Sequence, residues 1–382
     1  MSERPAPQRP APIAPAEYAE RVTRVAAAAD AAGFDALVAF SSSWRPGNAL
    51  WLTGATPTNG HVLAVLAPGG ELHLLVDQAW DVGGQRDQSW LPGDRVHAAP
   101  DLAATAAPLL RGARRIGVAG WEILPAPVLE GLRAALGDGV HVGPAGPLLD
   151  RLRMRKSPAE VALLREACRI TDVAAHVLAD ACRTGGGMTE RELAVEIEAA
   201  LKRAGSGRLA FPLVLGAGID ATASVVPFPG DRVLAPGDLV LLDVGATYGG
   251  YCADLSRTGC VGLEPAPAQR ALLEATLALY EAMEAALRPG LPADELHALA
   301  VAEARARGYE LPFLAGHNTG VENHEDPVLD GASGLVLEPG MLETLEPGIY
   351  VPGVGGARIE KTVLVTETGC EPLSAAPLRL WA

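Results

Sequence analysis

The sequence predicts an α+β protein with an α/β domain over residues 1–150 and a larger α+β domain over residues 151–382. Two observations support this prediction. In the first part, short apolar runs typical of strands alternate with segments of helical spacing. In the second part, the order helix, helix, hairpin occurs twice, which indicates two pseudo-equivalent halves.

The composition is that of an ordinary globular protein and argues against several classes of partner. The 382 residues suffice for two domains and a large core. The formal charge of -15, from 31 basic and 46 acidic residues, argues against nucleic acid or an anionic membrane as partner. No run approaches the roughly 20 apolar residues of a membrane span. The five cysteines form no CxxC, and an odd count without a signal peptide predicts reduced thiols in the cytoplasm.

The first domain is expected to follow a flexible tail rich in Pro and Ala, which extends to about residue 15. Helices are predicted at 17–33, 102–110 and 127–136. Strands are predicted at 34–40, 50–52, 61–67, 71–76, 95–98 and 115–118. The domain contains no Gly-rich phosphate loop, so its own residues do not indicate a function.

The second domain begins with two strong helix starts. Residues 157–160 (Ser-Pro-Ala-Glu) combine an N-cap serine, a proline at N1 and a glutamate at N3, and the helix is predicted to run to about residue 183. Residues 189–192 (Thr-Glu-Arg-Glu) form a second capping box, which opens a helix to about residue 204. Two further helices are predicted at 268–287 and 293–307.

Two carboxylates, Asp243 and Asp254, lie within residues 239–258, whose flanking runs are otherwise apolar or weakly polar. A β-hairpin with Tyr248 and Gly249 at its tip would place Asp243 opposite Asp254. Two ionised carboxylates in such a pair would repel each other and lose hydration unless a cation neutralised them. The alternative is two acids on a solvated strand face, which is the usual environment of acids.

A second hairpin with a Gly-rich turn centred on Gly353 is predicted within residues 341–366, and it places Glu346 opposite Glu360. Between the hairpins, His317 lies in a glycine-flanked loop that can bring an imidazole close to a site. Four carboxylates and one imidazole form a hard ligand set with room for two divalent ions, of the Mn, Co, Fe or Zn kind. A structural zinc site would more often use thiolates.

The contexts of these residues carry a family resemblance. The segments LLDVG, ADLSRT, GH, EPGIY and RIE, together with residues 52–54 and 153–160, resemble the pita-bread metallopeptidase family M24. This family contains Xaa-Pro dipeptidases, aminopeptidases P, methionine aminopeptidases and creatinase, and the match covers nearly the whole chain. The resemblance implies a pita-bread catalytic domain preceded by a creatinase-like N-terminal domain.

The resemblance also implies a role for each site residue. The five metal ligands would be Asp243, Asp254, His317, Glu346 and Glu360. In the implied mechanism Asp254 and Glu360 bridge two ions, and Glu346 also carries a proton to the leaving nitrogen. His324 would bind the substrate or the tetrahedral intermediate, and the alternative is an ordinary surface-loop histidine. Arg358 would be a cation that binds substrate or supports a ligand, and the alternative is a strand-edge arginine.

Three residues depart from the family pattern. Val226 stands where family peptidases place a histidine upstream of the first aspartate, aligned through residues 231–233. Lys361 replaces the usual aspartate after the last glutamate, and Asn318 stands where many relatives carry glycine. A valine at position 226 offers only an apolar wall where relatives have a hydrogen-bonding group.

The resemblance implies a dinuclear metal hydrolase of a small peptide or amide, with an Xaa-Pro dipeptide as the default substrate class. One alternative is C–N hydrolysis or lyase chemistry on a non-peptide metabolite, which Val226 favours. Another is a binding module without catalysis, against which the five retained ligands argue. A homodimer is also implied, in which Trp44, Arg45 or Trp51 could reach the partner's site. An ordinary core or rim role is the alternative for each of these three residues.

Overall fold

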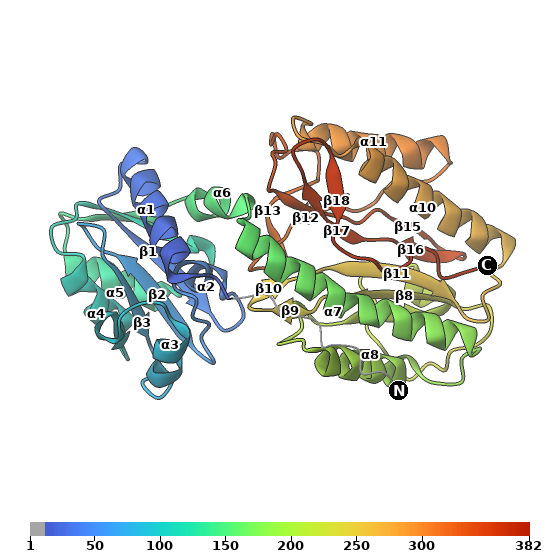
Figure 1. Cartoon of the computed structure of the whole chain (residues 1–382), viewed down its shortest axis with the longest axis horizontal. Helices are drawn as coiled ribbons and strands as arrows, with labels where there is room; N and C mark the ends of the chain where they lie inside the picture. Colours follow the sequence, from blue (N-terminus) through green and yellow to red (C-terminus); the bar gives the residue numbers. More distant parts are fainter. Residues whose placement is uncertain (1–11) are drawn as a thin grey trace. The chain divides into compact units, whose positions relative to one another are not determined.

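The computed structural model describes residues 12–382, which form two compact units, Pro12–Arg153 and Met154–Ala382 (Figure 1). Residues 1–11 of the predicted tail lie outside the described residues. From Pro15 onward the chain is helical, so the tail prediction does not extend to its last position.

The N-terminal unit is built on one six-stranded mixed sheet with the order β4-β3-β2-β1-β5-β6. Its strands are β1 (Ala36–Ser42), β2 (His61–Leu66), β3 (Leu72–Val76), β4 (Val96–Ala98), β5 (Arg115–Ala119) and β6 (His141–Pro144). Its helices are α1 (Pro15–Ala31), α2 (Gly47–Thr53), α3 (Val82–Gln88), α4 (Leu102–Leu109), α5 (Ala126–Leu136) and α6 (Leu148–Met154). Two short 3-10 turns, η1 (Gly93–Arg95) and η2 (Trp121–Ile123), complete it.

One predicted element of this unit is wrong, because residues 50–52 belong to helix α2 and not to a strand. A run of three apolar residues is too short to distinguish the two structures by periodicity. Gly54 ends the helix in the left-handed conformation, with φ of 77°, as glycine commonly does after a helix. Within this helix Trp51 is buried in the core, whereas Trp44, outside it, is 82% exposed.

The C-terminal unit repeats the order helix, helix, strands, as predicted. Its first half contains α7 (Pro158–Arg183), α8 (Glu190–Ala204), β7 (Val214–Ala217), α9 (Gly218–Thr222), β8 (Leu239–Val244), β9 (Thr247–Tyr248), β10 (Tyr251–Cys252) and β11 (Leu255–Cys260). Its second half contains α10 (Pro267–Ala286), α11 (Ala293–Ala306), β12 (His317–Asn318), β13 (Glu325–Val328), β14 (Leu342–Leu345), β15 (Gly348–Val351), β16 (Gly355–Arg358), β17 (Lys361–Val365) and β18 (Cys370–Pro372). The sheets are β11-β8-β7 and β13-β12-β14-β17-β18, with the two-stranded ribbons β10-β9 and β15-β16.

Both predicted capping boxes of this unit are present. The Ser157 hydroxyl accepts from the backbone of Glu160, whose carboxylate accepts in turn from the backbone of Ser157. Thr189 and Glu192 repeat the arrangement at the start of α8. These local bonds satisfy backbone donors that have no partner inside a helix, so the helix starts could be predicted from sequence alone.

Two helix pairs lie on opposite sides of the strands of this unit (Figure 1). On one side, α7 and α8 bury apolar residues such as Leu178 and Ile197 against Leu242 of β8. On the other, α10 and α11 bury residues such as Leu272 against Ile359, in the segment between β16 and β17. The strands that carry the predicted ligands are therefore held between two apolar layers.

The register of the first hairpin differs from the prediction by two residues. Tyr248 pairs with Tyr251, so Gly249 and Gly250 form the tip, with φ of 56° and 83°. A tight hairpin turn favours positive φ at both central residues, which two glycines supply at no steric cost. Asp243 consequently pairs with Ser256 and not with Asp254. A shift of two residues preserves the side-chain alternation, so the two aspartates still share a face.

The register of the second hairpin is as predicted. Leu345 pairs with Lys361 where β14 meets β17, and Gly348 pairs with Arg358 where β15 meets β16. Both ladders have the register that puts Glu346 opposite Glu360 in the gap between them. Two acids from the ends of separate strands are thereby brought to one place.

Candidate metal centre

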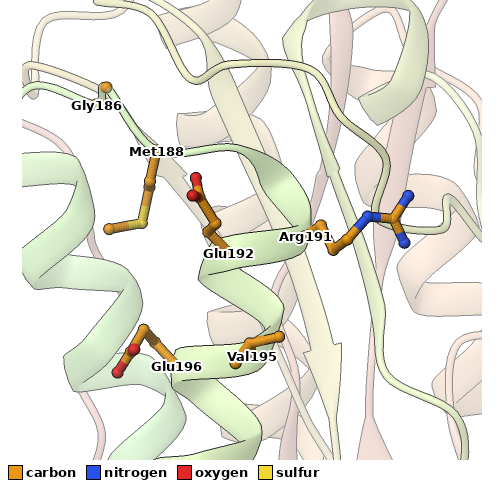
Figure 2. Close-up of a pocket in the computed structure, with 7 residues that line it drawn as sticks. Gly186, Met188, Arg191, Glu192, Val195 and Glu196 are labelled. Carbon is orange, nitrogen blue, oxygen red and sulfur yellow. The ribbon is translucent and has the colours of Figure 1, made fainter.

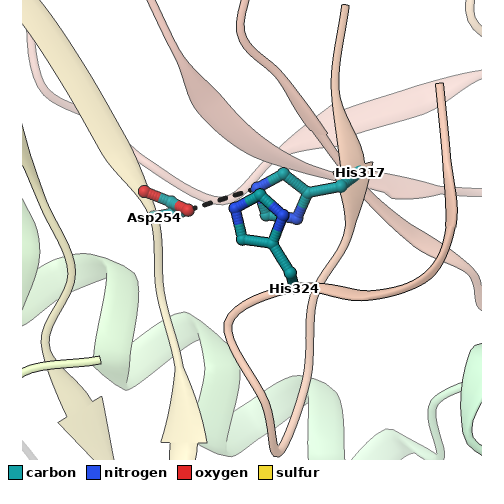
Figure 3. Close-up of side chains that lie close together, drawn as sticks. All are labelled: Asp254, His317 and His324. Atoms are coloured by element: carbon teal, nitrogen blue, oxygen red, sulfur yellow. Dashed lines mark ion pairs between the residues drawn. The ribbon is translucent and has the colours of Figure 1, made fainter. Parts of the chain in front are cut away.

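The five predicted ligands come together in overlapping groups whose ligand atoms lie within 4.8 Å of one another. The groups are Asp243, Asp254 and Glu360; His317, Glu346 and Glu360; and Asp254, His317 and His324. His317 Nε2 lies 3.4 Å from Asp254 Oδ2 and 3.4 Å from Glu346 Oε1. Figure 3 shows Asp254 facing the two imidazoles. The strands therefore gather four carboxylates and two histidines into one centre.

Each of the five predicted ligands has a buried side-chain atom with no hydrogen-bond partner within residues 12–382. These atoms are Asp243 Oδ1, Asp254 Oδ1, His317 Nε2, Glu346 Oε1 and Glu360 Oε1. A buried polar atom left without a partner costs about 1–3 kcal/mol, and more when it is charged. All five atoms are electron-pair donors, so divalent cations would satisfy them together, and the residues fit such a group.

His317 has the protonation state of a metal ligand. Its Nδ1 lies 2.9 Å from the backbone oxygen of Asn318, an acceptor, so Nδ1 carries the proton and Nε2 is left with a free lone pair. Burial lowers the pKa of His317 to about 4. The imidazole is therefore neutral at pH 7 and presents its lone pair to the carboxylates.

The carboxyl groups of the centre disfavour one another's ionisation. Burial raises the pKa of Asp254, and the nearby carboxylate of Asp243 raises it further. Burial and Glu360 raise the pKa of Glu346, and burial and Asp254 raise that of Glu360. A bound cation would reverse these effects, because opposite charge favours the ionised form.

Arg358 is only 2% exposed, so it is not a solvent-exposed arginine at a strand edge. Its Nη2 donates to Asp243 Oδ2 at 2.5 Å and its Nε donates to Ser256 Oγ at 2.8 Å. Its Nη1 donates to the hydroxyl of Tyr350 and to the backbone oxygen of Val225. Burial alone would lower the pKa of Arg358, but the Asp243 carboxylate outweighs it and the pKa is raised. Arg358 is therefore a permanent cation behind the centre.

Ser256 and Tyr350 were missed in the sequence, although both contact the predicted site residues. The Ser256 hydroxyl donates to Glu360 Oε2 at 2.8 Å, while it accepts from Arg358. Ser256 stands two residues after Asp254, and side chains two apart in a strand share a face. That alternation is the signal that could have identified it.

His324 lies in an exposed bend, but its ring stacks on that of His317 (Figure 3). The ring centroids are 3.7 Å apart and the planes differ by 16°. The exposed imidazole of His324 therefore lies directly against the buried ring of a predicted ligand.

Lys361 directly follows Glu360 in the chain, but its side chain does not belong to the group of predicted ligands. Lys361 is the first residue of β17, and the charged groups that affect its pKa, Arg257, Glu284 and Asp172, include none of the predicted ligands. It is half-buried, and burial together with the cation of Arg257 lowers its pKa. The cation therefore does not compete with a metal at the centre.

Glu343 is a buried acid of β14 that the sequence reasoning also missed. Its side chain is 0% exposed, and neither carboxyl oxygen has a hydrogen-bond partner among the described residues. Burial raises its pKa to about 8, against a small opposing effect of Lys156. It therefore holds a proton at pH 7.

The raised pKa of Glu343 predicts a stability that falls with pH. Between about pH 4.5, the ordinary pKa, and about pH 8, the unfolded chain has lost the proton while the folded protein keeps it. Glu343→Gln is neutral at every pH, so its free energy of unfolding relative to wild type should rise by roughly 2–4 kcal/mol across this range. Urea unfolding at four pH values with fixed metal content measures this. The exposed Glu367→Gln is the control, and a pH-independent difference for Glu343→Gln would contradict the prediction.

A separate surface groove of about 690 Å³ lies at the start of α8 (Figure 2). It is lined by Gly186, Gly187, Met188, Arg191, Glu192, Val195 and Glu196. Glu192 is engaged in the capping box and Arg191 in an ion pair with Asp231. None of the predicted site residues lines this groove.

None of the helices within residues 12–382 combines the length and the apolar composition needed to cross a membrane. The five cysteines are free thiols, four of them buried.

The chain is similar to known protein families over most of its length. The model of metallopeptidase family M24 matches residues 162–367, and that of the creatinase/prolidase N-terminal domain matches residues 21–155. The chain is 29% identical over 331 residues to an Xaa-Pro dipeptidase of Pyrococcus horikoshii, covering 86% of this chain and 90% of that one. It is 37% identical over 227 residues to an Xaa-Pro dipeptidase of Pyrococcus furiosus, covering 58% and 64%.

Among solved structures, an Xaa-Pro dipeptidase from Bacillus anthracis superimposes with a TM-score of 0.84 at 29% identity. The superposition covers 95% of this chain and 99% of the other. The predicted α+β fold, with a creatinase-like N-terminal part and a pita-bread part, is thereby confirmed. The chain belongs to metallopeptidase family M24 and is an enzyme of the hydrolase class.

Proposed function

We propose that the protein is a dinuclear metal-dependent hydrolase of short peptides or amides, with Xaa-Pro dipeptides as the first substrate class to test. The observation that carries this proposal is the set of five buried ligand atoms without partners, gathered in one centre. The named relatives support the substrate class, because both matched sequences and the matched structure are Xaa-Pro dipeptidases.

We propose that Asp254 and Glu360 are shared between two ions. Each belongs to two of the three ligand groups. His317 also belongs to two, but its Nε2 has a single lone pair and could bind only one ion. Asp243 would complete the first ion's ligands, and His317 with Glu346 the second's. Divalent ions of the Mn, Co, Fe or Zn kind, when bound there, would polarise a carbonyl and lower the pKa of water.

The remaining chemistry falls to the chain's own residues. Glu346 is a buried carboxyl whose pKa is raised by burial and by Glu360, so the oxygen that does not bind metal could take a proton from the attacking water and give it to the leaving nitrogen. The exposed imidazole of His324 can bind the substrate's carbonyl or the oxyanion that develops on it. Arg358 is bonded to Asp243 and, through Ser256, reaches Glu360, so it holds both acids in place.

A panel of peptides tests the proposal. Metal-loaded enzyme is expected to hydrolyse at least some Xaa-Pro dipeptides, and a chelator should abolish turnover. The panel includes dipeptides without proline, tripeptides with proline in second position, and small amides. No hydrolysis of any member by enzyme with full metal content would contradict the peptidase proposal.

Val226 favours one alternative function, an M24-fold enzyme with a non-peptide substrate. Its side chain is 50% exposed, in a segment whose preceding carbonyl, that of Val225, accepts from Arg358. An apolar group there cannot supply the hydrogen bond expected of a histidine. C–N hydrolysis or lyase activity on a small metabolite, with peptides left intact, would support this alternative.

We further propose a homodimer, as the family resemblance implies, in the cytoplasm, which the five unpaired cysteines support. Light scattering at micromolar concentration should then give about twice the 39.5 kDa chain mass. Trp44, 82% exposed, is a candidate contact with a partner, whereas Trp80, 64% exposed in the same unit, serves as control. Trp44→Ser should weaken the dimer or its activity and Trp80→Ser should not. A fully active monomer would contradict the proposal.

A further inference from the structure

We propose that the buried ion pair between Lys156 and Glu325 positions His324 over the metal centre. The two side chains are 1% and 2% exposed, with Nζ and Oε2 3.1 Å apart. Neither Lys156 nor Glu325 forms a hydrogen bond with the five partnerless ligand atoms. The role of this ion pair would therefore be to fix the loop and not to bind metal. The inference rests on the proposed function, because that function gives His324 its task.

The position of His324 depends on how its loop is held. The residue lies in a bend outside helix and strand, and its side chain is exposed. Its ring nevertheless stacks on the buried ring of His317 at 3.7 Å between centroids. A side chain on an exposed bend stays in one position only if the backbone on both sides of its residue is fixed.

Glu325 provides that fixation from the position directly after His324. Its Oε1 accepts from the backbone N–H of Val321 at 3.0 Å and of Glu322 at 3.2 Å. The backbone N–H of Gly320 also donates to the oxygen of Glu322, at 3.0 Å. The side chain of Glu325 is thus hydrogen-bonded to the backbone three and four residues before Glu325. These bonds close a short loop that includes His324.

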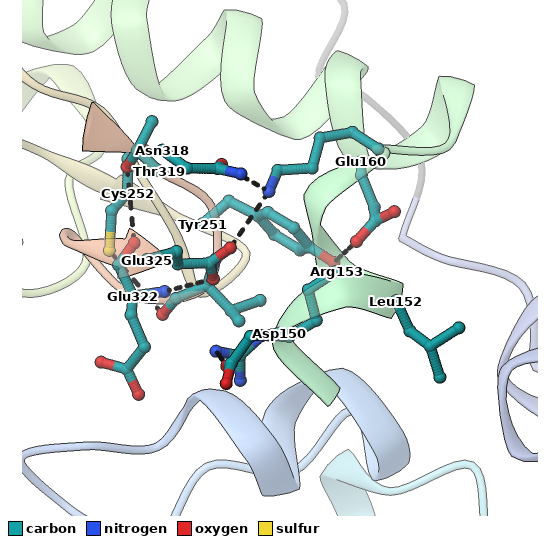
Figure 4. A network of polar contacts seen from close by, with 12 residues as sticks. Asp150, Leu152, Arg153, Glu160, Tyr251, Cys252, Asn318, Thr319, Glu322 and Glu325 are labelled. Atoms are coloured by element: carbon teal, nitrogen blue, oxygen red, sulfur yellow. Dashed lines mark hydrogen bonds and ion pairs between the residues drawn. The ribbon is translucent and has the colours of Figure 1, made fainter. Parts of the chain in front are cut away.

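Lys156 links this loop to Asn318, the residue after His317. Figure 4 shows Asn318 and Glu325 in one network of polar contacts. The Lys156 ammonium donates to Glu325 Oε2 and to Asn318 Oδ1, each at 3.1 Å. Asn318 directly follows His317, as Glu325 directly follows His324. One ammonium group therefore sets the positions of the residues next to both histidines, while the Lys156 backbone is anchored on the oxygen of Gly340 at 2.7 Å.

Gly320 shows how closely this assembly is packed. A Cβ at this position would lie 2.9 Å from both Lys156 Nζ and Glu325 Oε2. Such contacts are shorter than carbon allows, so the ends of both side chains would have to shift if a residue other than glycine stood here. Removing one partner of a buried pair leaves the other charge uncompensated, so the loop should move in response.

Kinetic coupling tests the proposal. Glu325→Gln keeps the side-chain shape, but its amide would face the Lys156 ammonium. In metal-replete enzyme, kcat should fall about 10-fold in Glu325→Gln and about 10²-fold in His324→Ala. The double variant should lose no more than His324→Ala alone, because Glu325 acts through His324. Multiplied losses, or an unchanged kcat in Glu325→Gln, would overturn the proposal.

Two controls separate positioning from general stability. Glu338→Gln breaks an exposed ion pair with Arg155, the residue before Lys156, and should leave kcat, metal content and thermal midpoint unchanged. Glu325→Gln should likewise keep its metal. If that variant does not fold, Lys156→Met with Glu325→Gln removes both charges together and is tested in the same cycle with His324→Ala.

A readout independent of activity separates this proposal from the proposed function. Amide hydrogen exchange of Val321 and Glu322 should accelerate in Glu325→Gln, and the His324 ring signals should move in the NMR spectrum as the stack is lost. These results would support the positioning role even if no peptide were hydrolysed. Unchanged exchange together with unchanged ring signals would overturn it whatever the substrate.

Discussion

Replacing Asp254 or Glu360 by alanine is expected to remove both metal ions and to lower turnover by about 10³-fold or more. Each of these acids belongs to two of the three ligand groups, so its loss would leave both ions incompletely held. Asp243 belongs to one group, and Asp243→Ala should lose about one ion per chain. Metal content after dialysis, measured beside kcat on the best peptide, gives the comparison.

The control for these substitutions is Asp231→Asn, which removes a carboxylate that is paired with Arg191 on the surface. It should keep both ions and full turnover, because exposed ion pairs contribute little. Full activity in a metal-free preparation would exclude the metal-dependent mechanism. Equal metal loss from Asp243→Ala and Asp254→Ala would instead disprove the bridging assignment, while leaving metal dependence intact.

The parts of the fold that were predictable from sequence are those decided by neighbouring residues. The capping boxes at Ser157 and Thr189 are complete within four residues, and both helices begin as predicted. The register that sets Glu346 opposite Glu360, between the two ladders, follows from one Gly-rich turn. In the first hairpin the predicted tip was wrong by one residue, which shifts the pairing by two, because the conformational freedom of Gly249-Gly250 decided the tip. A register shift of two residues leaves the alternation of side chains between the two faces unchanged, so Asp243 and Asp254 still share a face.

The parts that could not be predicted depend on contacts between distant residues. Lys156 and Glu325 are 169 positions apart, so no pattern of neighbouring residues predicts their ion pair. Glu343 resembles an ordinary strand acid in sequence, and its raised pKa comes from burial by the surrounding fold. Arg358 illustrates the intermediate case, because its place near Glu360 is visible in the sequence but its bond to Asp243 is not.

The second large effect is expected at Val226, where a histidine should increase peptide turnover. The flanking backbone is already fixed, because the carbonyl of Val225 accepts from Arg358 at 2.9 Å and that of Pro227 accepts from Leu215 at 3.0 Å. The valine side chain itself is 50% exposed, so a larger ring fits without displacing the core. Val226→His can therefore add a hydrogen-bond donor near the centre while the loop stays in place.

Wild type is expected to hydrolyse ordinary Xaa-Pro dipeptides weakly, and Val226→His should raise kcat/KM by about 10²-fold, the usual contribution of one catalytic donor or acid. Phe228→His is the matched control, because Phe228 lies in the same loop, is 68% exposed and follows the fixed Pro227. The control should gain nothing. Rapid turnover by wild type with no gain in Val226→His would show that the histidine is dispensable, since the remaining residues would then stabilise the transition state unaided. Slow turnover by both would direct the search to non-peptide substrates that bring their own polar group to the valine.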